Sequence, residues 1–110
     1  MGKFTVGDVI LVNFPFSDLR NQKHRPAIVV ARAEFNDVIV CQITSKPYSA
    51  KHRIEVTKKD FQSGTLPVNS FARPDKLFTF SEKLIVSKLA NLSPAKKNEI
   101  LAELQNIFSN

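Results

Sequence analysis

The stretch Lys23-His24-Arg25-Pro26-Ala27-Ile28-Val29-Val30 joins a charged cluster directly to an apolar run. Pro26 fixes its own φ angle and pushes the preceding residue towards an extended conformation. The sequence therefore predicts that a buried strand begins here, with Arg25 held in an extended conformation at its start. A guanidinium presented in this way is a permanently charged fork that binds anions. When this stretch is considered without the rest of the chain, the simpler interpretation is that Arg25 is an ordinary surface arginine beside a strand start.

Further apolar runs, rich in β-branched residues and bounded by turn residues, follow along the chain. Such runs are typical of short strands. We expect strands at 9–14, 26–32, 38 to 44 or 45, 53–57, 68–73 and 76–80, with Pro74 interrupting the last two. Residues 58–65 are expected to be irregular, with at most one helical turn, and 84–89 fits either a strand or a short helix.

The last part of the chain predicts a helix. Ser93 is a good N-cap and Pro94 a good first-turn residue. An apolar stripe at helical spacing comprises Ile100, Leu101, Leu104, Ile107 and Phe108. We expect this stripe to pack on a sheet rather than in a partner's groove. Many short strands followed by one helix predict a mainly β fold, a small β-barrel or curled sheet with helical cover, as a single domain over 1–110.

The charge of the chain favours a polyanionic partner such as nucleic acid. The 110 residues carry a net charge of +6, with a pI near 9.7. No acidic residue lies between Asp18 and Glu34 or between Asp37 and Glu55, whereas both intervals contain several basic ones. If the two intervals meet in space, they form one positive surface.

No apolar run is long enough to span a bilayer, and no secretory signal is visible, so we expect a protein without membrane contact in a reduced, cytoplasmic setting. The one cysteine, Cys41, lies in an apolar run and is expected to be a buried, inert thiol.

Polar residues stand at the ends of three predicted strands. Besides Arg25, an otherwise apolar strand ends at Thr44, and Arg73 and Asp75 flank Pro74. An extended backbone places Arg73 and Asp75 on one face, and Thr44 and Ser45 on opposite faces. For the hydroxyls of Thr44 and Ser45, the structural alternative is capping of backbone groups at the strand end. For Arg73 and Asp75, it is an ion pair without a catalytic role.

Other chemistries find little support. The chain has no glycine-rich phosphate loop and no zinc-ligand pattern around His24 or His52, so neither a metal nor a cofactor is predicted.

In this order and at these separations, the motifs resemble those of the MazF/PemK toxins of bacterial type II toxin–antitoxin systems. The segments that carry the resemblance are Gly7-Asp8-Val9-Ile10-Leu11-Val12, Phe14-Pro15-Phe16, Arg25-Pro26-Ala27-Ile28-Val29-Val30, Gln42-Ile43-Thr44-Ser45 and Ser70-Phe71-Ala72-Arg73-Pro74-Asp75-Lys76-Leu77-Phe78-Thr79.

The resemblance implies an SH3-like barrel of about five to seven strands with a C-terminal helix, and a homodimer. It implies a metal-independent endoribonuclease that cuts single-stranded RNA at short sequences. In such enzymes the ribose 2′-OH attacks the adjacent phosphate and leaves 2′,3′-cyclic phosphate and 5′-OH ends. A cognate antitoxin protein is implied as a partner that covers the RNA groove, with DNA contacted only through the antitoxin complex.

By the same resemblance, Arg25 matches the arginine that stabilises the phosphorane, and Thr44 the hydroxyl that orients the scissile phosphate. Arg73 and Asp75 match residues that some members use as acid and base. Members with a catalytic histidine in the first loop carry it earlier and near glycine, whereas this chain has Asp18-Leu19-Arg20 there. His24 is not its equivalent by position, so the proton-transfer roles stay open.

A basic groove with aromatic platforms suits single-stranded RNA. The residues expected to bind RNA around the catalytic set are Phe16, Arg20, Lys23, His24, Ser45, Lys46 and Tyr48. For Phe16 and Tyr48, core packing is the alternative role. Two other functions remain open: a toxin of the CcdB type that poisons DNA gyrase through its C-terminal helix, and a nucleic-acid-binding barrel without catalysis.

Overall fold

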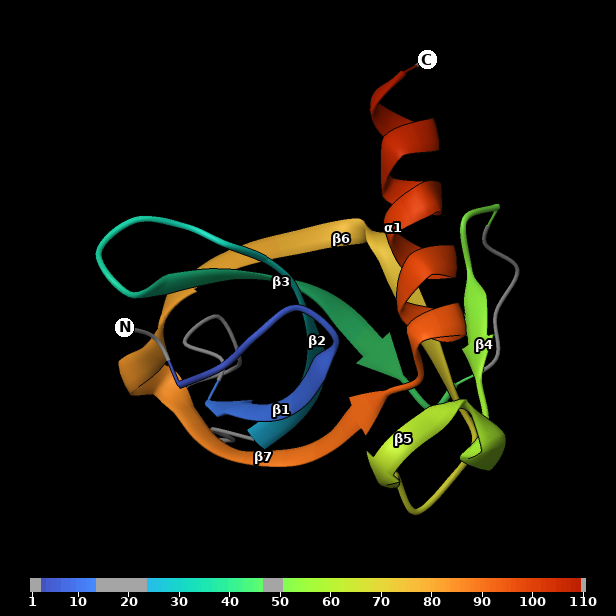
Figure 1. Cartoon of the computed structure of the whole chain (residues 1–110), viewed down its shortest axis with the longest axis horizontal. Helices are drawn as coiled ribbons and strands as arrows, with labels where there is room; N and C mark the ends of the chain where they lie inside the picture. The colour runs from blue at the N-terminus through green and yellow to red at the C-terminus, as the bar shows by residue number, and fades with distance from the viewer. Residues whose placement is uncertain (1–2, 14–23, 47–50, 110) are drawn as a thin grey trace.

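Seven strands form one curled antiparallel sheet, and an α-helix lies against it, in the part of the chain that the computed structural model describes, residues 3–13, 24–46 and 51–109 (Figure 1). The elements in chain order are β1 (Asp8–Asn13), β2 (His24–Arg32), β3 (Asp37–Thr44), β4 (Ile54–Val56), the 3₁₀ turn η1 (Lys58–Asp60), β5 (Phe61–Gly64), β6 (Ser70–Ser81), the 3₁₀ turn η2 (Glu82–Leu84), β7 (Ile85–Leu92) and α1 (Pro94–Phe108). Their spatial order is β4-β6-β3-β2-β1-β7-β5. The prediction of a mainly β fold with a terminal helix is confirmed.

Both faces of the central strands are buried. Along β2, Ala27 and Val29 point into one apolar cluster and Ile28 and Val30 into another. The first cluster, here called the inner core, contains Ile10, Val12, Ala27, Val29, Val38, Val40 and Phe80. The second, the helix-side core, contains Val9, Ile28, Val30, Cys41, Ile43, Ile54, Val56, Leu66, Ala72, Ala90, Leu92, Ile100 and Leu104. Two buried faces explain why the central strands are continuous apolar runs rather than alternating ones.

Helix α1 begins as predicted. The Ser93 hydroxyl accepts a hydrogen bond from the Lys96 N–H at 3.2 Å, and Pro94 occupies the first turn. Ile100 and Leu104 are buried against the sheet, but Phe108 is 72% exposed. The prediction that the whole stripe packs on the sheet is therefore wrong for Phe108. The reason is geometric: the sheet curls, and the end of α1 extends past it (Figure 1).

Pro74 does not interrupt a strand, contrary to the prediction, because β6 runs continuously from Ser70 to Ser81. The pairing of β3 with β6 shifts between Cys41–Leu77 and Gln42–Arg73, which leaves residues 74–76 outside the ladder. A proline at such a bulge loses no ladder hydrogen bond.

Segment 58–65 differs from the prediction, and segment 84–89 shows which of its two predicted structures forms. The helical turn expected in 58–65 is η1, but Phe61–Gly64 then forms β5, an edge strand that pairs with β7. Gly64 has a φ angle of +68°, and a Cβ there would lie 2.4 Å from the Leu89 carbonyl oxygen. Only glycine allows this close approach. The segment that fitted either strand or helix is strand β7, preceded by η2.

The packing of α1 generates a first prediction. Ile100→Ala should lower the free energy of unfolding by about 2–5 kcal/mol, because the 1%-exposed side chain fills the space between helix and sheet. Phe108→Ala, on the same helix, should change it by less than about 0.5 kcal/mol. Urea unfolding followed by circular dichroism measures both, and equal losses in the two variants would contradict this packing.

Candidate nucleic-acid interface

The register of the sheet brings Arg25 and Thr44 together. Ala27 pairs with Gln42 across β2 and β3. Arg25 and Thr44 each lie two residues beyond this pair, at the same end of the two strands and, by the alternation of an extended strand, on the face of Ala27 and Gln42. Paired residues point to the same face of a sheet, and neighbouring strands lie about 4.8 Å apart. Arg25 is exposed, and no described acidic side chain forms an ion pair with it. Its guanidinium is thus available to an anion.

The pairing continues across two more strands. Thr44 pairs with Phe71 of β6, and Phe71 pairs with Glu55 of β4. These residues are half-buried or exposed, whereas the alternate positions Ile43, Ala72 and Ile54 lie in the helix-side core. One face at this end of the sheet is therefore a polar shelf, defined here as Arg25, Thr44, Phe71 and Glu55 with Arg53 and Arg73.

The Thr44 hydroxyl accepts a hydrogen bond from the Lys46 backbone N–H at 3.2 Å. The capping role considered for it is therefore present. A hydroxyl that accepts one bond still has its own proton to donate. Thr44 can therefore cap the strand end and donate to a ligand oxygen at the same time.

Arg73 and Asp75 form a two-pronged ion pair. The Arg73 Nη2 lies 2.6 Å from Asp75 Oδ2, and Nε lies 3.2 Å from Oδ1. The hydrogen bonds and charge of Arg73 lower the pKa of the Asp75 carboxyl, and the charge of His52 adds to this. Asp75 is therefore a carboxylate at neutral pH, able to accept a proton but not to donate one. In the β3–β6 ladder Arg73 lies opposite Gln42, two residues from Thr44 on the same face of the sheet.

Arg53 and Phe71 form a contact that the sequence did not predict. The Arg53 guanidinium carbon lies 4.8 Å from the centre of the Phe71 ring, within the range of a cation–π interaction. Arg53 is exposed and lies directly before β4, and its neighbour across the sheet depends on the register of β4 with β6. That register is a long-range property that no local pattern contains.

A second ion pair ties this end of the sheet to the helix. His52 Nδ1 contacts Glu103 Oε2 of α1. His52 was considered at the sequence level only as a metal ligand, and no described group of residues could hold a metal ion. Cys41 is fully buried, and burial raises its pKa to about 12, in agreement with the prediction of an inert thiol.

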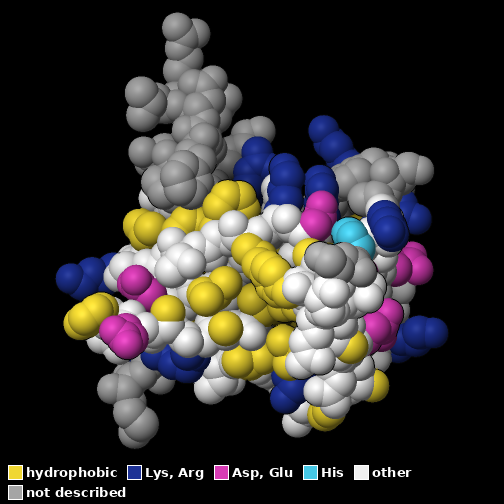
Figure 2. Space-filling model, turned by 90° about the horizontal axis from the view of Figure 1, so that it is seen from above, with side chains coloured by type: hydrophobic (Ala, Val, Ile, Leu, Met, Phe, Trp, Pro, Cys, Tyr) yellow, Lys and Arg dark blue, Asp and Glu magenta, His cyan; other side chains and the backbone are white. Residues whose placement is uncertain are grey.

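The residues predicted to bind RNA divide into two groups. His24, Ser45 and Lys46 are exposed at the ends of β2 and β3 beside Arg25 and Thr44. Phe16, Arg20, Lys23 and Tyr48 lie outside the described residues. In the space-filling view, Lys and Arg side chains gather along one edge, next to a histidine (Figure 2).

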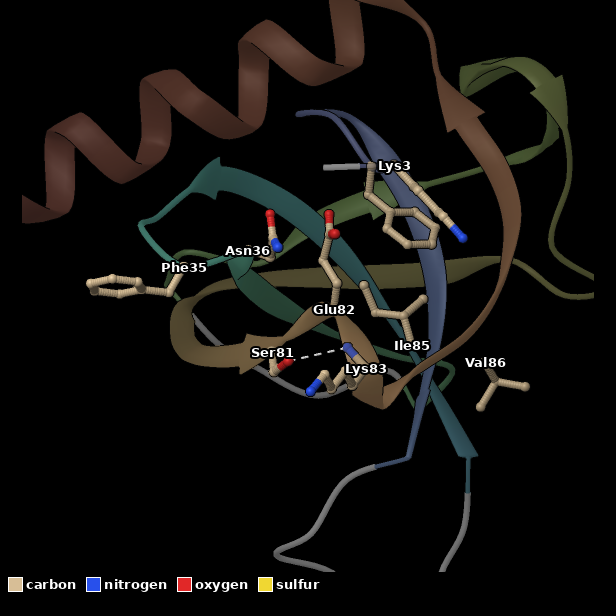
Figure 3. A pocket seen from close by; sticks show the side chains of 9 residues that line it. Lys3, Phe35, Asn36, Ser81, Glu82, Lys83, Ile85 and Val86 are labelled. Carbon is tan, nitrogen blue, oxygen red and sulfur yellow. Dashed lines mark hydrogen bonds between the residues drawn. The ribbon is translucent and has the colours of Figure 1, made fainter. Parts of the chain in front are cut away.

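A pocket of about 570 Å³ lies at the opposite end of the β2–β3 pair (Figure 3). It is lined by Lys3, Phe4, Phe35, Asn36, Ser81, Glu82, Lys83, Ile85 and Val86. The eight residues of β2 from Arg25 to Arg32, seven steps of about 3.3 Å, separate it from the shelf by roughly 23 Å. None of the predicted catalytic residues lines it, so its volume does not make it the site.

The fold and the shelf define a class of protein, a small curled β-sheet domain with several fixed cations at one end of its sheet. Residues 5–108 match the model of the PemK-like, MazF-like toxins of type II toxin–antitoxin systems, and the chain belongs to this family. Curated protein sequences give no significant match to the chain. Within the described residues, no helix is long and apolar enough to cross a membrane.

Solved structures share the fold at low sequence identity. An endoribonuclease in complex with its cognate antitoxin from mycobacterial species is 16% identical, with a TM-score of 0.74 over 94% of this chain and 93% of that one. MazF of Deinococcus radiodurans is 18% identical, with a TM-score of 0.72 over 96% of each chain. The Mycobacterium tuberculosis toxin MazF-mt6 is 15% identical, with a TM-score of 0.72 over 93% of this chain and 96% of that one.

The Arg73–Asp75 ion pair generates a second prediction. Because the pKa of Asp75 is lower in the folded protein than in the unfolded chain, its ionised form stabilises the fold at neutral pH. That contribution is lost as the pH falls below about 4. Asp75→Asn should therefore flatten the acid side of the stability profile measured by urea unfolding. Glu34→Gln, which removes an exposed carboxylate at the other end of β2, should leave the profile unchanged, and parallel curves for Asp75→Asn and the original chain would refute the argument.

Proposed function

We propose that this chain is the toxin of a type II toxin–antitoxin system and cleaves single-stranded RNA as a sequence-specific, metal-independent endoribonuclease. Membership of the toxin family supports the first part. The second is supported by solved neighbours that are endoribonucleases. The observation that supports it most directly is that Arg25 and Thr44 lie at the same end of the β2–β3 pair, each two residues beyond the Ala27–Gln42 pair.

The proposed reaction is attack of a ribose 2′-oxygen on the adjacent phosphorus, with loss of the 2′-proton. The bond from phosphorus to the 5′-oxygen breaks, that oxygen takes a proton, and the products carry 2′,3′-cyclic phosphate and 5′-OH ends. Arg25 would bind the negative charge that develops on the phosphate oxygens, and the Thr44 hydroxyl would orient one of them. A fixed donor of this kind typically contributes a factor of about 10²–10³ to the rate.

The state of Asp75 limits the proton-transfer roles. As a carboxylate it can serve only as the acceptor of the 2′-proton. Arg73 holds that carboxylate and stands beside it as a second fixed cation. We assign Asp75 the role of base and Arg73 that of charge stabilisation, with donation to the 5′-oxygen as its alternative role.

The proposal includes partners. A cognate antitoxin protein would cover the shelf, the chain would act as a cytoplasmic homodimer, and DNA would be contacted only through the antitoxin complex. The net charge of +6 supports association with RNA and with an acidic antitoxin segment.

Replacement of Arg25 generates a third prediction. Arg25→Ala should lower the rate of RNA cleavage at least 100-fold in the presence of a chelator, because the phosphorane loses its fixed cation. Lys83→Ala, which removes one charge at the far end of the sheet, should retain the original rate. Electrophoresis and end mapping of the RNA products measure the rate and the chemistry.

A growth assay of the variants, run beside the RNA cleavage assay, separates the alternative functions. A chain that cleaves no RNA, stays toxic as Arg25→Ala and loses toxicity as Phe108→Ala would act through the end of α1, as a gyrase poison does. Salt-sensitive RNA binding without products would identify a non-catalytic binding domain.

A further inference from the structure

The polar shelf extends beyond the residues that the proposed reaction uses. Phe71 lies one strand from Thr44, and Glu55 lies one strand further. At about 4.8 Å per strand, Phe71 is roughly 10 Å from Arg25 in backbone separation. A nucleotide whose phosphate sits between Arg25 and Thr44 can therefore place a neighbouring base over Phe71.

Phe71 and Arg53 have the form of a stacking platform. Phe71 is half-buried, and the Arg53 guanidinium lies 4.8 Å from its ring centre. RNA bases stack on aromatic rings and on arginine planes alike. A base laid on the guanidinium would extend the stack of ring and cation.

The platform stands on a rigid part of the sheet. Ile54 and Val56, on either side of Glu55, are buried in the helix-side core. The backbone carbonyl of Glu55 accepts a hydrogen bond from Lys96 Nζ of α1 at 3.0 Å. These contacts fix β4 to the helix, so the Glu55 side chain projects from a rigid backbone.

Glu55 is the residue that a purely phosphate-binding surface would not contain, because a carboxylate repels phosphate. Asp75, the other acid nearby, is neutralised by Arg73, whereas no described basic side chain forms an ion pair with Glu55. A carboxylate only accepts hydrogen bonds, and its usual partner among the bases is an amino group.

We propose that Phe71, Arg53 and Glu55 form a nucleobase subsite beside the scissile phosphate, which takes a base with an exocyclic amino group and discriminates against uracil. Cytosine, adenine and guanine offer N–H donors from an amino group to Glu55. Uracil has no amino group, and its one N–H on the pairing edge lies between two carbonyl oxygens, which the carboxylate repels. The inference rests on the proposed endoribonuclease activity and adds a source of sequence preference to it.

Cleavage of a pool of single-stranded RNAs with randomised sequence tests the subsite, with all cleavage positions read from the new ends. The original chain should disfavour uracil about tenfold at one fixed position next to the cut. Glu55→Gln, whose side chain can donate to a carbonyl as well as accept, should reduce that discrimination severalfold. Phe71→Ala should raise KM about tenfold, and Phe71→Tyr, which keeps a ring, should restore it.

Glu34→Gln, an equivalent change at the exposed β2–β3 turn, serves as the control and should keep the original preference. Circular dichroism and urea unfolding establish that each variant is folded, and the exposed position of Glu55 keeps the test valid if Phe71→Ala is unstable. Active enzyme in which Glu55→Gln preserves the full discrimination would overturn the subsite and leave the proposed function standing. Absence of cleavage by the original chain would instead remove the proposed function, and the subsite with it.

Discussion

The pairing of β3 with β6 is the constraint on which the rest of the structure depends. It extends from Asp37–Ser81 to Thr44–Phe71 and shifts register once, after Cys41. On one side of that shift, Val38 and Val40 fill the inner core, and on the other, Thr44 stands on the shelf. A slip by one residue would exchange the two faces, so that Ile43 would leave the helix-side core and Thr44 would enter it. One ladder therefore fixes both the core and the place where the cations gather.

The bulge in this ladder explains how Arg73 and Asp75, two residues of one strand, can form an ion pair. Residues 74–76 leave the ladder, and Pro74 turns inward while the Asp75 side chain reaches back to Arg73. Bulges re-aim side chains in this way and are frequent next to functional sites. The free energy gained by burying Pro74 holds the pair in position, and the proximity of Arg73 keeps Asp75 ionised.

Local chemistry made much of this architecture predictable. The Arg25-Pro26 strand start, the apolar run before Thr44 and the Ser93-Pro94 helix start each depend on residues adjacent in sequence. What the sequence did not show depends on distant partners. Edge strand β5 exists because β7 offers it a partner, Phe108 is exposed because the sheet curls away, and Arg53 meets Phe71 only through the register of β4 with β6. Such properties follow from tertiary pairing, which propensity and periodicity do not encode.

The strand order has a consequence for how such a protein is made. The shelf is assembled from residues 25, 44, 53, 55, 71 and 73, and the β1 edge is closed only when β7 emerges and pairs with it. At the usual rate of translation, roughly 3–10 s separate the synthesis of Arg25 from that of Asp75. A nascent chain thus carries Arg25 for seconds without β6, the strand that completes the shelf. The topology therefore delays assembly of the shelf until most of the chain has been synthesised.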